Sequence, residues 1–162
     1  MSTAAAPLAL YRDTVPGQWI DYNGHMNVAY YVLAFDRATD ALLEHVGLGR
    51  DYRGRTQRSV FTLENHVSYL RELLQGEAFY CTTQLIDCDA KRIHYFQHLY
   101  HAGREELAAT CEAILLHMDM NQRRAATFEP GIDARLQAVL DEHRRLPRPA
   151  QLGSVIGIRR KS

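Results

Sequence analysis

A short polar stretch near the N-terminus holds the residue types that acid–base chemistry needs. It combines one carboxylate, two amides, one imidazole, one glycine and two aromatic rings in the order Trp19-Ile20-Asp21-Tyr22-Asn23-Gly24-His25-Met26-Asn27. An apolar-periodic segment follows directly. Backbone N–H groups, the positive end of a helix dipole and an acid–base group would therefore converge at one point. This stretch is where we expect chemistry.

A long amphipathic helix is predicted to position that stretch. Asn27 is a good N-cap, and Gly47 is a good stop signal. Between them apolar residues recur at offsets of three and four: Val28, Tyr31, Val32, Phe35, Ala38, Leu42, Leu43 and Val46. The length and the single apolar face predict a central helix packed against a sheet.

In most of the remaining chain, apolar and polar residues alternate as they do in β-strands. A first strand is expected to end near residues 19–20, and further strands are expected over 60–70, 79–87, 92–100 and 106–120. The last of these is rich in helix formers, but its position after three meandering strands favours a strand. Glu64, His66 and Ser68 are predicted to share one face of their strand. Residues 50–57 are expected to be a loop or short helical turn, and 132–145 a helix.

The predicted fold is therefore α+β: one strand, a long helix, a four-strand antiparallel meander wrapping that helix, and a terminal helix. Residues 1–146 are expected to form one domain and residues 147–162 a C-terminal tail. Such a sheet leaves edges to cover, and edge-to-edge dimerisation would cover them.

Composition narrows the classes of partner. The formal net charge is +0 and the sequence pI is about 7.1, so nucleic acid is not expected as a partner. No apolar run reaches the roughly 20 residues of a membrane-spanning helix, and no secretory signal is recognisable. Three cysteines without metal spacing predict reduced thiols and a cytoplasmic protein. No metal or cofactor motif is present, and His94, His98 and His101 are not expected to converge on one strand face.

The order of elements, with D-x-x-G-H-x-N directly before the long helix, resembles the hotdog-fold acyl-CoA thioesterases of the 4-hydroxybenzoyl-CoA thioesterase-like branch. The residues that carry the resemblance are Asp21, Gly24, His25, Asn27 and Tyr31, with further matches at 62–70 and 75–77. The resemblance spans roughly Tyr11 to Met120. Within the family, residues 19–27, 83–85 and 89–92 look most similar to the betainyl-CoA thioesterases associated with carnitine dehydrogenase.

This resemblance implies roles for particular residues. Asp21 matches the catalytic carboxylate and would act as general base or nucleophile. Gly24 and His25 would present N–H groups to the thioester carbonyl, and Asn23 would orient water or Asp21. Asn27 is more often a helix cap, although it could also contact substrate. Glu64 is expected on the sheet face that packs on the helix, where a charged side chain is costly unless it is paired. It would then be a second carboxylate contributed by a partner subunit, unless it is a solvated strand residue or a partner for Arg71 or Arg92.

A betainyl group carries a quaternary ammonium, which aromatic faces hold best. The candidate substrate-binding residues are Trp19, Tyr22, Asn27, Tyr30, Tyr31, His66 and Tyr69. Aromatic residues are equally common in cores, and Glu64 could serve the cation instead of the chemistry. Lys91, Arg92, Arg123 and Arg124 are candidates for the CoA phosphates.

Acyl-CoA is thus the expected substrate, with no cofactor and with a homodimer or homotetramer as the active form. Two alternatives remain open at the level of sequence. The first is a hotdog-fold enoyl-CoA hydratase or dehydratase, and the second is a non-catalytic acyl-CoA-binding module.

Overall fold

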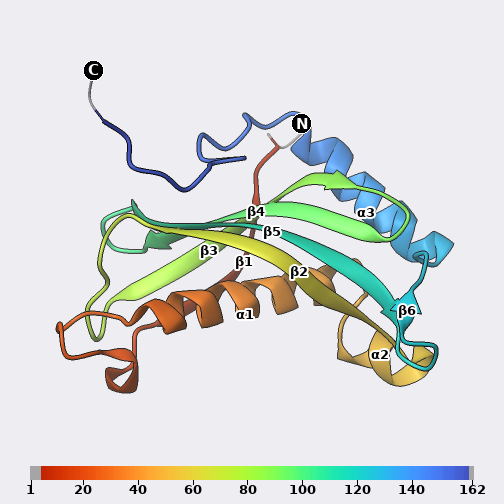
Figure 1. Cartoon of the computed structure of the whole chain (residues 1–162), viewed down its shortest axis with the longest axis horizontal. Coiled ribbons are helices and arrows are strands. Elements are labelled where there is room, and N and C mark those ends of the chain that lie inside the picture. Colours follow the sequence, from red (N-terminus) through yellow and green to blue (C-terminus); the bar gives the residue numbers. More distant parts are fainter. Residues whose placement is uncertain (1–4, 161–162) are drawn as a thin grey trace.

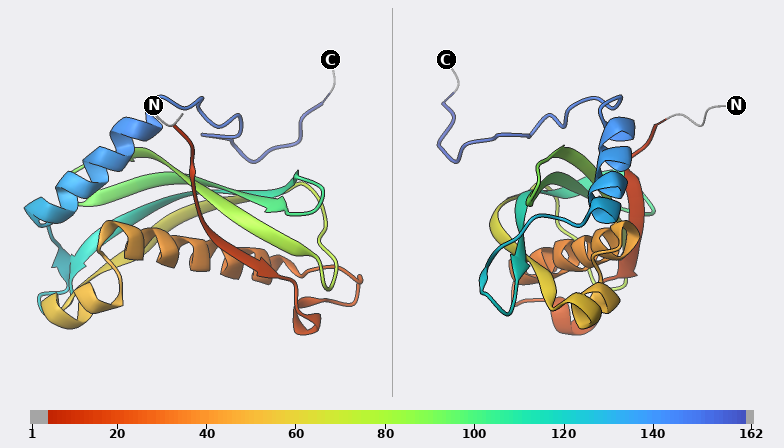
Figure 2. Two further views of the ribbon diagram at one scale, coloured as in Figure 1. Left: turned by 180° about the vertical axis from the view of Figure 1, so that it is seen from behind. Right: turned by 90° about the vertical axis from the view of Figure 1, so that its right-hand side faces the viewer.

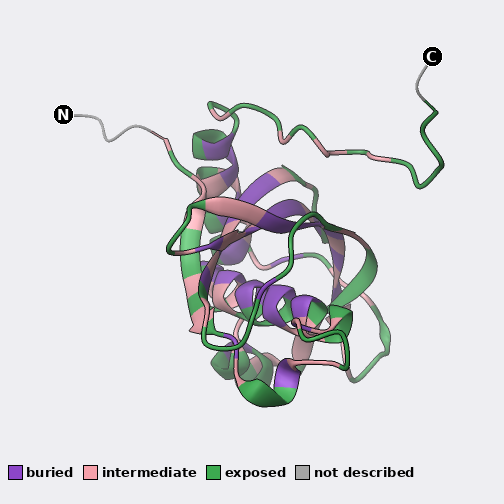
Figure 3. Cartoon of the chain, turned by 90° about the vertical axis from the view of Figure 1, so that its left-hand side faces the viewer, coloured by how far each residue is buried: buried purple, intermediate pink, exposed green. Residues whose placement is uncertain are grey.

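Helix α1 (Val28–Val46) runs along the concave face of a curved antiparallel sheet in the computed structural model, which describes residues 5–160 (Figure 1). Its boundaries follow from its caps. The Asn27 side chain accepts a hydrogen bond from the Ala29 N–H at 3.0 Å, and Gly47 adopts φ 85°. The buried face of the helix turns toward the sheet (Figure 3). The predicted helix, its N-cap and its stop signal are therefore confirmed.

The sheet holds six strands among the described residues, in the order β1-β3-β4-β5-β2, with β6 paired to β5. Their bounds are β1 Leu8–Thr14, β2 Arg58–Tyr69, β3 Ala78–Cys88, β4 Arg92–His101, β5 Glu106–Asp119 and β6 Arg124–Ala125. The strand predicted over 106–120 is confirmed. The four-strand meander is wrong: only β3, β4 and β5 form a meander, while β2 pairs with β5 and lies at an edge. The first strand also ends earlier than expected, because a short 3-10 turn, η1 (Gly17–Trp19), precedes the helix.

A β-bulge divides β2 into two halves, and the residues that face α1 have even numbers in one half and odd numbers in the other. Thr62 pairs with Leu115 and Glu64 pairs with Ile114, so Leu63 is the extra residue. Before the bulge, even-numbered residues face α1; after it, odd-numbered residues do. Glu64, His66 and Ser68 therefore share one face, as predicted, and it is the outer face of the sheet.

Two further helices and the C-terminal segment complete the chain. Helix α2 (Arg50–Thr56) confirms the short helical turn expected after α1, and helix α3 (Pro130–His143) packs against β3. The Leu85 N–H donates to His143 Nδ1 at 2.8 Å across that contact. Residues 147–160 return over the face of the sheet opposite to α1 (Figures 1 and 2). There the Gly153 N–H donates to Glu112 Oε2 at 2.7 Å.

Several of the cysteines and histidines of the sheet are buried or paired with neighbouring residues. Cys81 and Cys111 are buried free thiols, and burial raises the pKa of Cys111 to about 12. His94 contacts Glu112 on the outer face, whereas His101 is buried and lies 3.3 Å from Glu77. No group of His, Cys, Asp or Glu within residues 5–160 is arranged to hold a metal ion. Over the same residues, no helix has both the length and the apolarity needed to cross a membrane.

Candidate active site

The residues from Trp19 to Asn27, here called the Asp21 loop, form a closed turn in front of α1. The Asp21 N–H donates to His25 O at 3.1 Å, and the Asn27 N–H donates to Trp19 O at 2.9 Å. Gly24 supplies the φ of 83° that the turn requires, which a residue with a Cβ adopts only under strain. The Met26 N–H donates to Leu73 O at 2.8 Å, so the loop is also tied to the segment after β2.

The Asp21 carboxylate is half-buried, and both of its oxygens are held. Oδ1 accepts the Asn23 N–H at 2.8 Å, and Oδ2 accepts a hydrogen bond from Asn27 Nδ2 at 3.3 Å. Two hydrogen bonds leave lone pairs that can accept a hydrogen bond from a water molecule or attack the carbon of a carbonyl group. The arrangement suits a carboxylate that takes a proton or attacks a carbonyl.

Hydrogen-bond donors for a developing oxyanion are fewer than the sequence suggested. The Gly24 N–H donates to Asp21 O at 3.0 Å and so closes the turn itself. Among residues 5–160 the His25 N–H has no hydrogen-bond partner. His25 Nδ1 lies 3.3 Å from Met26 O, and donation there leaves Nε2 available. His25 is thus the residue of this pair that can still face a substrate.

Three of the predicted aromatic residues, Trp19, Tyr22 and Tyr30, line none of the clefts found among residues 5–160. Trp19 is buried, stacks on Tyr30 at 5.1 Å between ring centroids and lies 5.4 Å beneath the Arg37 guanidinium. Its ring is part of the core. Tyr22 points into solvent with 97% of its surface exposed.

Tyr31 and Tyr69 do line a cleft beside the Asp21 loop. This Tyr69 cleft has a volume of about 240 Å³, and its principal lining residues are His25, Val28, Tyr31, Tyr69, Arg71 and Glu72. The Tyr31 hydroxyl accepts the Leu73 N–H at 3.0 Å and donates to Arg71 O at 3.2 Å. Segment 71–73 is therefore fixed to α1. Sequence reasoning missed Arg71 and Glu72, which lie beyond the end of a strand and belong to no motif.

Glu64 and His66 lie elsewhere. Together with His94 and Glu112 they line a cleft of about 280 Å³ on the outer face of the sheet, next to Gly153 and Ser154 of the C-terminal segment. The expectation that Glu64 sits on the sheet face that packs on the helix is wrong, because its ladder partner Ile114 and the paired His94 belong to the opposite face. Within one chain, Glu64 and the Asp21 loop line different clefts.

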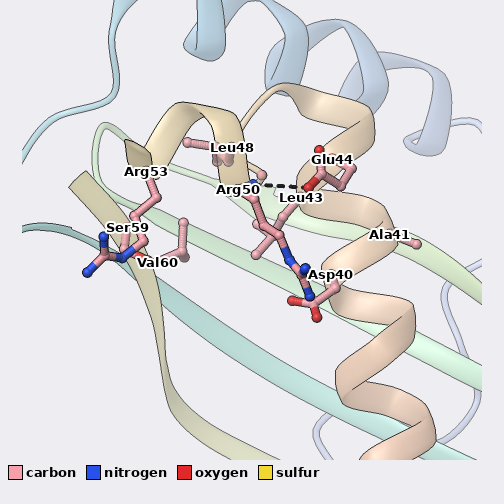
Figure 4. Close-up of a pocket in the computed structure, with 10 residues that line it drawn as sticks. Asp40, Ala41, Leu43, Glu44, Leu48, Arg50, Arg53, Ser59 and Val60 are labelled. Carbon is pink, nitrogen blue, oxygen red and sulfur yellow. Dashed lines mark hydrogen bonds between the residues drawn. The ribbon is translucent and has the colours of Figure 1, made fainter. Parts of the chain in front are cut away.

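A third concavity, of about 350 Å³, lies where α1 ends and α2 begins (Figure 4). Its Arg50 N–H donates to Glu44 Oε1 at 3.0 Å. Burial, and secondarily the neighbouring Asp36, raise the pKa of Asp40 there. A 19-residue helix is about 28 Å long, so this concavity is far from Asp21 in the same chain.

Arg92, a predicted phosphate ligand, is ion-paired with Asp89.

Comparison with known proteins identifies the family to which this chain is similar. The family model described as "Thioesterase-like superfamily" matches residues 15–136. A betainyl-CoA thioesterase of Pseudomonas aeruginosa is 41% identical over 151 residues, which cover 93% of this chain and 95% of that protein. An L-carnitine dehydrogenase/betainyl-CoA thioesterase of a Rhizobium species is 34% identical over 154 residues, which cover 95% of this chain but only 31% of the longer protein.

A solved structure shares nearly the whole fold. A hypothetical protein of Staphylococcus aureus, determined in complex with CoA, superposes with a TM-score of 0.89 and is 30% identical. The match covers 98% of this chain and 100% of that chain.

Proposed function

Because this chain belongs to the thioesterase-like superfamily and is a hotdog-fold acyl-CoA thioesterase, we propose that it hydrolyses betainyl-CoA, with Asp21 as the catalytic residue. The observation that carries the catalytic assignment is the Asp21 carboxylate, held by Asn23 and Asn27 at the N-terminus of α1. The betainyl-CoA thioesterase of P. aeruginosa supports the substrate, since the similarity extends over almost the full length of both chains.

In the proposed reaction the thioester carbonyl lies between the Asp21 carboxylate and the start of α1. Asp21 takes a proton from a water molecule as the water oxygen adds to the carbonyl carbon. The His25 N–H and the helix dipole stabilise the oxyanion that forms. The C–S bond then breaks, the proton held by Asp21 passes to the leaving sulfur, and CoA is released as its thiol together with betaine, which regenerates the Asp21 carboxylate.

Asp21 could instead attack the carbonyl itself and form a mixed anhydride that water opens. Label found in Asp21 after a single turnover in water enriched in oxygen-18 identifies the direct attack. Attack by Asp21 places label in its carboxylate when water opens the anhydride at Asp21, and mass spectrometry of the loop peptide detects it. General-base catalysis labels only the released acid.

The proposed active form is a homodimer in the cytoplasm, joined through β2. That strand has a paired neighbour on one side only among the described residues. Phe61 is 41% exposed and Leu63 is 55% exposed along it. Pairing of two β2 edges would satisfy the open backbone groups and cover these side chains. It would also bring partner residues close to the N-terminal end of α1.

The deciding experiment measures CoA release with a thiol reagent across betainyl, short-chain, aromatic and long-chain acyl-CoAs. We expect the highest kcat/KM for betainyl-CoA, and we expect Asp21→Asn to lower kcat at least a hundredfold while the thermal melt is retained. Asp36→Asn, which removes an exposed carboxylate on α1, is the matched control. Near wild-type turnover by Asp21→Asn would refute the catalytic assignment. Preference for another acyl group would refute the substrate.

A further inference from the structure

The Tyr69 cleft lies where the acyl group of a betainyl thioester would have to go. In that substrate the quaternary nitrogen is only two bonds from the carbonyl carbon. A subsite for the ammonium must therefore adjoin the residues that act on the carbonyl. His25 belongs to the Asp21 loop and also lines the cleft. The outer-face cleft with Glu64 is on the other side of the sheet and does not meet this requirement.

The cleft offers an aromatic surface that is already held in place. The Tyr69 ring is 46% exposed and meets the Tyr31 ring edge-to-face at 5.4 Å, with an interplanar angle of 83°. The Tyr69 hydroxyl donates to Val28 O at 3.4 Å. A quaternary ammonium has no N–H to donate, so an aromatic ring is a suitable partner for it.

The cleft also offers an uncompensated negative charge. Glu72 lines it and is exposed, and among residues 5–160 its carboxylate has no ion-pair partner. Burial, and to a smaller extent the Glu72 carboxylate, raise the pKa of Tyr31 to about 12. The charge on Glu72 thus reaches the wall of the cleft.

Arg71 is the opposing charge, since its side chain belongs to the same lining. A guanidinium there disfavours a cationic acyl group and would suit a phosphate of the CoA instead. Repulsion of the acyl group and binding of a CoA phosphate can be told apart by comparing substrates. Repulsion acts only on a cationic acyl group, whereas phosphate binding acts on every acyl-CoA.

We propose that the Tyr69 cleft is the trimethylammonium subsite of this enzyme, with the Tyr69 ring and the Glu72 carboxylate as its recognition elements. This inference rests on the proposed function, and it assigns to Glu72 the cation-binding role that sequence reasoning offered to Glu64. It also makes Tyr69 and Glu72 specificity residues. A neutral acyl group of the same shape is attracted neither by the negative charge of the Glu72 carboxylate nor by the quadrupole of the Tyr69 ring.

The test compares betainyl-CoA with tert-butylacetyl-CoA, in which carbon replaces the quaternary nitrogen. The measured quantity is the ratio of the two kcat/KM values. We expect Tyr69→Leu and Glu72→Gln each to lower this ratio about tenfold. Tyr69→Phe should keep the ratio within about twofold, since the ring remains. Arg71→Gln should raise the ratio if Arg71 only repels the cation.

Two controls make the result specific. Glu142→Gln removes an exposed carboxylate on α3 and should leave the ratio unchanged. Dissociation constants of both esters for each variant in an Asp21→Asn background show whether recognition is by binding, even where turnover is lost. An unchanged ratio in Tyr69→Leu and Glu72→Gln overturns this inference while the proposed function stands. If the wild-type enzyme does not hydrolyse betainyl-CoA, the proposed function itself fails.

Discussion

Asn27 Nδ2 donates to Asp21 Oδ2 over 3.3 Å while Asn27 Oδ1 accepts the Ala29 N–H at 3.0 Å. One amide therefore begins the central helix with its oxygen and holds the proposed catalytic carboxylate with its nitrogen. Capping and catalysis are separable here, because a residue can retain the first function and lose the second.

Substitutions of Asn27 should separate the two functions. Asn27→Ser keeps a capping oxygen, so we expect a loss of only a few tenths of a kcal/mol in the free energy of unfolding. Asn27→Ala should lose about 1 kcal/mol. Both lack Nδ2, the atom that donates to Asp21, so kcat should fall by about tenfold in each, on the scale of one hydrogen bond to a charged group. Urea denaturation and CoA release measure the two effects, and wild-type kcat in Asn27→Ser would contradict the role assigned to the amide.

Gly24→Ala should act through the backbone alone. A Cβ at Gly24 would meet no atom within 4 Å, but φ is +83° there. We expect a loss of about 1 kcal/mol in stability and a lower kcat as the turn relaxes. Gly54→Ala is the matched control, since it lies inside α2 with equally open space and without positive φ. That control should be neutral or stabilising.

Tyr31→Phe should weaken the contact between α1 and the segment after β2. The substitution leaves the buried Leu73 N–H without the acceptor that lies 3.0 Å away. An unsatisfied buried donor costs about 1–3 kcal/mol, which urea denaturation can detect. We also expect a raised KM for betainyl-CoA, because the position of Arg71 and Glu72 depends on this hydroxyl. A stable variant with unchanged KM would show that the segment is held by other contacts.

Acid should destabilise the fold through His143. Burial lowers the pKa of His143, whose Nδ1 must be unprotonated to accept the Leu85 N–H. The unfolded chain therefore binds this proton at higher pH than the folded chain. The stability contribution is fully present above the ordinary histidine pKa of about 6.5 and is lost as pH falls below it. Urea midpoints between about pH 8 and pH 5 should fall less steeply in His143→Gln than in the wild type.

The β2 edge should carry the dimer. Replacing Phe61 and Leu63 together by Lys places charge on the exposed edge, so we expect light scattering to show a monomer with reduced turnover. Val155→Lys is the control, because Val155 is 82% exposed on the C-terminal segment rather than on β2. A double variant that still elutes as a dimer would place the interface elsewhere.

The sequence predicted those features that depend on local patterns. The bounds of α1 follow from Asn27, Gly47 and the apolar repeat between them, which all lie within one segment. The strand over Glu106–Asp119 was predicted against its helix propensity, because the turn spacing indicated a meander. The candidate Asp21 was found because its loop immediately precedes the helix.

Other features depend on pairing between distant segments and leave no local signal. Alternation along β2 does not encode whether β3 or β5 lies beside it, and the loop lengths permit both. The face of Glu64 depends on which side of β2 packs on α1. Glu72 lies beside the Asp21 loop because the Tyr31 hydroxyl and the Met26 N–H both hold segment 71–73. No spacing between residues 31 and 72 predicts that contact.

The bulge at Leu63 gives β2 one residue more than its ladder with β5 requires. Removing Leu63 would leave Thr62 opposite Leu115 and Glu64 opposite Ile114, so the side chains would alternate without a break and both halves of the strand would keep their faces. Position 63 is therefore the place in β2 where the length of the chain can change by one residue without turning Glu64, His66 or Val67 to the opposite face. An aligned chain that is one residue shorter here would carry its acidic and apolar positions in the same order along a regular strand.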